Sequence, residues 1–407
     1  MRAPLTPLKA FLSDAERLGE TGFGNVGDSR LSHWLSVAQA AERIAALPLN
    51  DRSEYVATLA NDVLPPTDDR PTQIDGDGSK PIDALSKLAE RLRVEAEQME
   101  KAGCFELALV TVSSVCRALS TGELSQRLLA SVHMGRVMRQ MGDLDNATDC
   151  YASVTADAQK AGEGPIAAHG YIGLGNVASE RGNRPLQKAH YLDALLLSPR
   201  GSPVELSSHM GLMVVAMARV DLADALLHGW RAHDLSPPNS DDQYGIISNM
   251  ARIAHQAGFL EAATAGFDFV IQHCTMPRGR IIAIGSAVRT AAALGSRLEV
   301  ERLVELGSAE IPKGAPPWET ASFFMWCAEA WHEIGNVPQR DLFANRAETI
   351  ADTFRFNEVR MKIDALRNMA APNAPSRPAP HILSYEQQTL SSETIRVGIH
   401  RLEALSV

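Results

Sequence analysis

The chain of 407 residues lacks several features that would point to a particular class of protein. Nowhere do about twenty apolar residues follow one another, so no membrane-spanning helix is predicted. The five cysteines are far apart and form no CxxC pair, which argues against a disulfide framework and a zinc ribbon. A formal net charge of −10 argues against broad nucleic-acid binding, which usually needs a basic face. We therefore expect a cytoplasmic protein that contacts neither a membrane nor nucleic acid directly.

Catalytic and metal-binding patterns are also missing. The stretch "WHEIG" at 331–335 lacks the second histidine, one helical turn later, that a zinc-protease helix needs. The glycines of "GYIGLGN" at 170–176 lie inside a helical pattern rather than between a strand and a helix. Asp75 and Asp77 are not followed by the glutamate that closes a calcium loop. These absences predict a protein that is not an enzyme and has no cofactor or metal.

What the sequence does contain is a repeat. Seven copies of one pattern can be aligned on a single position, and successive copies lie 37 to 40 residues apart. The aligned positions are Gly103, Gly142, Gly182, Val220, Gly258, Gly295 and Gly335. A period of this length is typical of arrays in which small structural units stack on their neighbours.

Each copy has the composition of a helical hairpin. A small residue such as Gly135 or Gly175 stands seven positions before the aligned glycine, and a larger one such as Tyr151 or Tyr191 follows nine positions after it. The glycine permits the positive φ that ends a first helix, and prolines such as Pro199 stop a second one. Such hairpins cannot bury their apolar faces alone, so neighbouring copies must stack.

The pattern resembles that of tetratricopeptide (TPR) repeats, which carry small, aromatic and proline residues at these relative places. The resemblance covers about residues 85 to 357 and is strongest over 131–199, whereas Gln187, Val300 and Arg340 depart from it. The resemblance implies an all-α fold, a right-handed α-solenoid of about seven TPR-like helical hairpins. It also implies an inner surface lined by the first helix of each pair.

The remaining segments flank this array. We expect an N-terminal helical region over 1–64, a linker over 65–81, the array over 82–369, a Pro/Ala-rich linker over 370–380 and a C-terminal helical segment over 381–407. Within the first region, helices are predicted over 31–47 and 52–64. The last segment has an apolar side formed by Ile395, Ile399, Leu402 and Leu405. We expect it to cover the last repeat; the alternative is a movable or dimerising segment that occupies a binding surface.

Polar and basic residues gather at the positions expected to line the inner surface. The position that follows the small residue is occupied in successive copies by Glu97, Arg136, Asn176, Val214, Arg252, Arg289 and Glu329. The predicted peptide-binding groove consists of Arg136, Arg139, Asn176, Asn249, Arg252, His255 and Arg289. Arginine can bind a carboxylate through two parallel hydrogen bonds, and asparagine can pair with both groups of a peptide bond. This pattern favours an acidic peptide or a C-terminal carboxylate as the ligand.

The function that follows is a non-enzymatic scaffold or regulator that binds a protein or peptide. One alternative is a ligand-gated sensor that controls signalling or transcription. Another is an enzyme whose site lies between the N-terminal region and the array. A role in homo-oligomer assembly also stays open.

Overall fold

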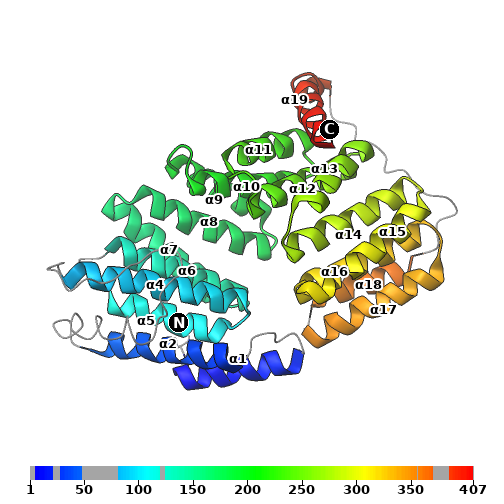
Figure 1. The fold of residues 1–407 in the computed structure, drawn as a ribbon. Helices are drawn as coiled ribbons and strands as arrows, with labels where there is room; N and C mark the ends of the chain where they lie inside the picture. The colour runs from blue at the N-terminus through cyan, green and yellow to red at the C-terminus, as the bar shows by residue number, and fades with distance from the viewer. Residues whose placement is uncertain are drawn as a thin grey trace. The chain divides into compact units, whose positions relative to one another are not determined.

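The computed structural model describes residues 5–21, 28–47, 81–119, 124–354, 356–369 and 385–406. The chain divides into two compact units, an N-terminal unit (Met1–Pro199) and a C-terminal unit (Arg200–Val407). All regular elements in the described ranges are helices (Figure 1), and none of them is long and apolar enough to cross a bilayer. The predicted helix over 52–64, the linker over 65–81 except its last residue, and the linker over 370–380 lie outside the described residues.

The N-terminal unit contains two leading helices and three helical hairpins. The leading helices are α1 (Pro7–Thr21) and α2 (Asp28–Ala46). The hairpins are α4 (Pro81–Lys101) with α5 (Phe105–Ala118), α6 (Leu124–Gln140) with α7 (Leu144–Ala161), and α8 (Gly164–Glu180) with α9 (Arg184–Leu197). Each hairpin packs against the next along the chain. The sequence predicted α2 and missed α1.

The C-terminal unit contains four hairpins and two further helices. The hairpins are α10 (Pro203–Ala218) with α11 (Leu222–Leu235), α12 (Asp241–Gln256) with α13 (Leu260–His273), α14 (Pro277–Ala293) with α15 (Arg297–Ser308), and α16 (Pro317–Glu333) with α17 (Val337–Phe354). A short 3-10 turn, η2 (Ile311–Lys313), precedes α16. After the hairpins come α18 (Asn357–Arg367), α19 (Tyr385–Glu403) and the 3-10 turn η3 (Ala404–Ser406). The predicted all-α fold of successive helical hairpins is therefore confirmed for the described residues.

The turn of each hairpin lies at the aligned position of the repeat. All six glycines there have a positive φ, between 71° and 85°, which ends the first helix as predicted. Polar residues directly after the turn, such as Asp143, Asn183 and Asp221, accept a hydrogen bond from a backbone N–H in the first turn of the second helix. The sequence thus encodes both the end of one helix and the start of the next.

Small residues allow the two helices of a hairpin, and the next hairpin, to approach closely. The ring of Tyr151 on α7 lies where a Cβ atom on Gly135 or Gly173 would be, at 2.8 Å and 2.3 Å from the nearest ring carbon. Tyr191 on α9 lies in the same way against Gly175, at 2.7 Å. The large residue nine positions after the turn thus packs against the small residue seven positions before it.

The N-terminal region packs on the first hairpin, because α1 and α2 both contact α5. The fully buried Asp14 of α1 accepts hydrogen bonds from the backbone N–H groups of Glu106 and Leu107, at 3.3 and 2.9 Å. The side chain of Cys104, at the N-cap position of α5, does not cap the helix, so Asp14 caps it from a distant part of the chain.

The two helices after the last hairpin occupy different places. Helix α18 packs on α16 and α17 and so covers the last hairpin, whereas α19 packs on α11 and α13 (Figure 1). The prediction that the C-terminal helix covers the last repeat is wrong. Its apolar side was identified correctly, since Ile399 and Leu402 are buried and Ile395 and Leu405 are partly buried. An apolar stripe predicts that a helix is covered, but it does not say by which neighbour.

Candidate binding surface on the first helices

The first helices of successive hairpins carry polar side chains that meet one another at the period of the repeat. In the N-terminal unit, Arg136 on α6 contacts Glu97 and Glu100 on α4, with N–O distances of 3.3 and 2.9 Å. Arg139 on α6 forms an ion pair with Glu180 on α8. We call these side chains, together with Arg252, Arg289 and Glu329 at the equivalent positions of the C-terminal unit, the first-helix surface. The partners are 36 to 41 residues apart, which is close to one repeat.

Glu100 is the most buried acid of this surface in the N-terminal unit. Its carboxylate accepts a hydrogen bond from Nε2 of the buried His133 at 2.9 Å and lies beside Arg136. Burial raises the pKa of the Glu100 carboxyl, but the hydrogen bond from His133 and the charge of Arg136 outweigh it and lower that pKa below its usual value. Glu100 therefore keeps its charge and compensates that of Arg136.

The three groove residues predicted in this unit all lie on first helices, and each of them has a partner within the protein. Asn176 on α8 accepts a hydrogen bond from the hydroxyl of Tyr191 at 2.7 Å. Arg136 and Arg139 are ion-paired, as described above. Their hydrogen-bonding capacity is thus partly used to join neighbouring helices.

The C-terminal unit has a different order of charges at the same repeat position. Val214, Arg252, Arg289 and Glu329 follow one another there. Arg289 on α14 forms an ion pair with Glu329 on α16, with Nε and Oε2 3.0 Å apart. At the position equivalent to Arg252 of α12, the preceding hairpin has the apolar Val214 and the following hairpin has the cation Arg289.

Arg252 consequently lacks a carboxylate partner among the described residues. Its one hydrogen bond to a side chain goes from Nη1 to Oδ1 of Asn249, at 3.2 Å. Burial, and then the positive charge of Arg289, lower the pKa of the Arg252 guanidinium. Because arginine stays charged in proteins, this half-buried cation is held where an anion would stabilise it.

His255, one helical turn after Arg252, presents an acceptor. The Thr290 hydroxyl donates its hydrogen to the Ser286 carbonyl at 3.2 Å, so it accepts a hydrogen bond from Nδ1–H of His255 at 3.0 Å. Nε2 of His255 is then the unprotonated nitrogen. Burial and the charge of Arg289 lower the pKa of His255 to about 4, so the imidazole is neutral at pH 7.

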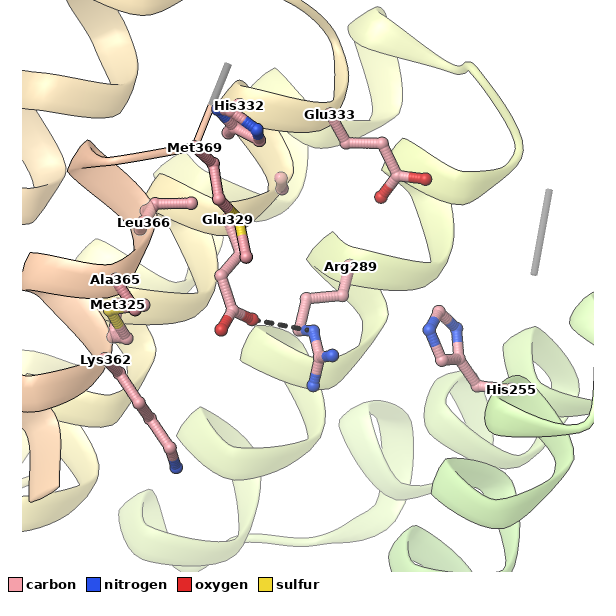
Figure 2. Close-up of a pocket in the computed structure, with 11 residues that line it drawn as sticks. His255, Arg289, Met325, Glu329, His332, Glu333, Lys362, Ala365, Leu366 and Met369 are labelled. Carbon is pink, nitrogen blue, oxygen red and sulfur yellow. Dashed lines mark ion pairs between the residues drawn. The ribbon is translucent and has the colours of Figure 1, made fainter. Parts of the chain in front are cut away.

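A cavity of about 480 Å³ opens beside these residues (Figure 2). It is lined by His255 of α12, Arg289 of α14, Met325, Glu329, Ala330, His332 and Glu333 of α16, and Lys362, Ala365, Leu366 and Met369 of α18 and its end. In Figure 2, Arg289 lies between Glu329 and His255. Three first helices and α18 therefore contribute to one cavity.

Several polar groups of this cavity have spare hydrogen-bonding capacity. Oε2 of Glu329 is close to Arg289 but not aligned for a hydrogen bond, and the buried Nδ1 of His332 has no hydrogen-bond partner. Burial raises the pKa of Glu333, and the nearby charge of Glu329 adds to this against the opposing effect of Arg289. The cavity thus offers cationic donors, carboxylate acceptors and an apolar wall formed by residues such as Leu366.

The sequence identified the cations of this surface but missed most of their partners. Glu100, Glu180 and Glu333 lie three or four residues after a position that was predicted to line the inner surface. Residues at this spacing share a helix face, so these glutamates could have been predicted to line the same surface. The ion pairs could also have been predicted, because equivalent positions of successive repeats lie next to one another.

No group of three or more histidine, cysteine, aspartate or glutamate side chains is arranged to hold a metal ion within the described residues. The predicted groove residues Asn249, Arg252, His255 and Arg289 do come together in the C-terminal unit, whereas Arg136, Arg139 and Asn176 belong to the N-terminal unit.

No family model and no curated protein match this chain. Among solved structures, it is similar to a tetratricopeptide repeat protein from Parabacteroides merdae, with 13% sequence identity and a TM-score of 0.47. The alignment covers 69% of this chain and 99% of that one.

Proposed function

We propose that the protein is a non-enzymatic scaffold that binds a protein or peptide on the first-helix surface of its C-terminal unit, with a carboxylate of the ligand at Arg252 and Arg289. The observation that carries this proposal is the state of Arg252. Three of the four predicted groove arginines are ion-paired to a neighbouring repeat, and Arg252 has only an amide partner among the described residues.

A half-buried cation without an anion costs the folded protein free energy, and a ligand that supplies the anion recovers part of it. A carboxylate can accept two parallel hydrogen bonds from a guanidinium, which fixes its orientation as well as its position. Arg252 is also held in place by Asn249 before any ligand arrives. Preorganisation of this kind lowers the entropy cost of binding.

The cavity next to Arg289 supports a peptide rather than a simple anion. Nε2 of His255 and the carboxylate of Glu333 can accept hydrogen bonds from backbone N–H groups or from a basic side chain. Met325, Leu366 and Met369 provide apolar surface for a side chain of the ligand. An acidic side chain and a C-terminal carboxylate both fit the cationic end of this arrangement.

A ligand-gated regulator is the second candidate, and the cavity is the observation that favours it. A volume of about 480 Å³ lies within the range of small-molecule sites, about 300–1,000 Å³. The alternative of an enzyme site between the N-terminal region and the array has no such support, because the buried Asp14 found there caps a helix.

The test uses a random peptide library with free C-termini, selected on the full chain. Peptides that bind are measured by calorimetry against the wild type, Arg252→Gln and Arg136→Gln, the last being a matched change at an arginine whose charge is already paired. We expect Arg252→Gln to weaken binding at least about tenfold, equal to 1.4 kcal/mol, and Arg136→Gln to leave it unchanged. An amidated copy of each peptide separates a C-terminal carboxylate from an acidic side chain. Equal affinities for all three proteins would show that the site is wrong.

A further inference from the structure

Helix α19 binds a surface formed by two second helices of the C-terminal unit. We call this the α19-binding surface and define it by Leu226, Trp230 and Asp234 of α11 and Gly266 of α13. Helix α19 packs on α11, α13 and, less extensively, α12, and η3 adds contacts to α13. Its main contacts are therefore with second helices, whereas Arg252 lies on a first helix and the cavity is lined by first helices and α18.

The packing between α19 and this surface is close and apolar. A Cβ atom at Gly398 would lie 3.1 Å from Leu226, and one at Gly266 would lie 3.0 Å from Leu402. Leu402 is completely buried and Ile399 nearly so. Small residues on both sides of the contact bring the backbones together, and so the surface selects a helix with this pattern.

Two polar contacts add orientation. The indole Nε1 of Trp230 donates a hydrogen bond to the Gly398 carbonyl at 3.2 Å. The guanidinium of Arg401 lies 3.9 Å above the centre of the Trp230 ring and contacts Asp234 at 2.8 Å. The surface thus contacts a backbone carbonyl, an arginine and the apolar stripe of α19, as a groove does when it binds a helical peptide.

The helix is connected to the rest of the unit by a long stretch of chain. Residues 370–384 separate the end region of α18 from α19, and fifteen residues can extend over at most about 50 Å. Within the described residues, the main contacts of α19 are with α11, α13 and η3, and α18 is not among its main neighbours. The surface therefore depends on the sequence of α19 and not on the molecule from which that helix comes.

We propose that the α19-binding surface accepts the α19 of a second copy of this chain, so that two molecules exchange their C-terminal helices. The contacts in the exchanged pair are the same as those within one molecule, which makes exchange a low-cost route to a dimer. Within one molecule the connecting stretch keeps α19 at an effective concentration of about millimolar. The monomer therefore predominates in dilute solution, and the dimer gains with protein concentration.

The experiment mixes two full-length variants that fail in complementary ways. The donor chain carries Trp230→Ala and Asp234→Arg, which damage the surface and leave α19 intact. The acceptor chain carries Leu402→Asp, which places a charge at the fully buried position of α19 and leaves the surface intact. Each variant alone should have the mass of one chain by light scattering, whereas the mixture should form a one-to-one dimer of twice that mass.

A donor chain that also carries Leu402→Asp is the matched control, and its mixture with the acceptor should stay monomeric. Thermal melting verifies that each variant is folded, and Asp234→Arg alone replaces the double change if Trp230→Ala unfolds the unit. The proposal is overturned if the mixture of donor and acceptor keeps the mass of one chain, or if the control mixture dimerises equally.

Discussion

Val220 occupies the turn position that glycine fills in the other six hairpins. Its φ is 57°, in the left-handed region, where a β-branched side chain is crowded by its own backbone. The hydrogen bonds of the α10–α11 hairpin hold this geometry, since Asp221 still caps α11 and its N–H still bonds to the Ala216 carbonyl. The residue therefore stores strain that the rest of the repeat compensates.

Replacing Val220 by glycine should stabilise the C-terminal unit. Relief of the left-handed strain contributes about 1–2 kcal/mol, reduced by the greater freedom of glycine in the unfolded chain. Urea denaturation of the two proteins measures the difference. The matched control is Gly258→Val, which introduces the same side chain at a turn whose φ is 85° and should destabilise. If Val220→Gly lowers the free energy of unfolding, the strain argument fails.

His255 should make the C-terminal unit less stable in mild acid. Its pKa is about 4 in the folded protein and about 6.5 in an unfolded chain, so the unfolded state binds more protons between these values. Stability is complete above pH 6.5, falls as the pH decreases toward 4 and then levels off. The loss is about 1–3 kcal/mol, because the side chain is only partly buried.

Urea denaturation at pH 7 and pH 4.5 checks this expectation against His255→Asn, whose amide can still donate to Thr290. The variant should lose less stability between the two pH values than the wild type, since the other histidines are common to both. The same loss in both proteins would assign the acid sensitivity to other groups.

At the scale of elements, the hairpins depend on glycines that admit aromatic rings. Tyr151 fills the space beside Gly173, where a Cβ atom would lie 2.3 to 2.4 Å from three ring carbons. Gly164 lies in the first turn of the same helix, α8. A Cβ atom placed on it would be 3.7 Å from the Leu197 carbonyl oxygen, which is an ordinary contact. The same substitution at these two sites therefore separates packing from helix propensity.

Gly173→Ala should destabilise the N-terminal unit by about 1–3 kcal/mol or more, because the ring of Tyr151 must leave its position. Gly164→Ala should be neutral or stabilising by up to about 1 kcal/mol, since alanine favours a helix more than glycine does. Melting temperatures of the two variants test the pair. Equal melting temperatures would show that Tyr151 can adapt without cost.

The same elements show why one part of the fold was predictable and another was not. Turns such as Gly142 were predictable because a positive φ and a helix end leave a local signature. The position of α19 was not, because its apolar stripe fits any exposed apolar face. The ion pair of Arg289 and Glu329 was predictable only after the period was known, and the role of Asp14 as a cap for α5 had no local signal at all.

At the scale of the molecule, each of the two units has its own main hydrophobic core. One core joins residues from Ala10 to Val177, and the other joins residues from Leu206 to Leu402. A smaller cluster around Leu128 and Val154 also belongs to the N-terminal unit. The sequence predicted one array over 82–369, because the period continues through residue 199 without a change in composition. Separate cores are the physical basis for separate cooperative units, which a regular period does not reveal.

Two cores predict that the chain unfolds in two steps, and its tryptophans can report which step is which. Trp34 is the one tryptophan of the N-terminal unit, whereas Trp230, Trp318, Trp326 and Trp331 belong to the C-terminal unit. In a Trp34→Phe background, fluorescence follows the C-terminal unit alone, and circular dichroism follows the helices of both. We expect urea transitions from the two probes that do not coincide.

Adding Gly173→Ala to that background should then shift the circular dichroism curve to lower urea and leave the fluorescence midpoint unchanged. Val220→Gly should do the opposite, moving the fluorescence midpoint to higher urea. If both probes move together in both variants, the chain unfolds as one cooperative unit. Strain at one turn would then be shared by every hairpin, and stability gained at Val220 would offset packing lost at Gly173.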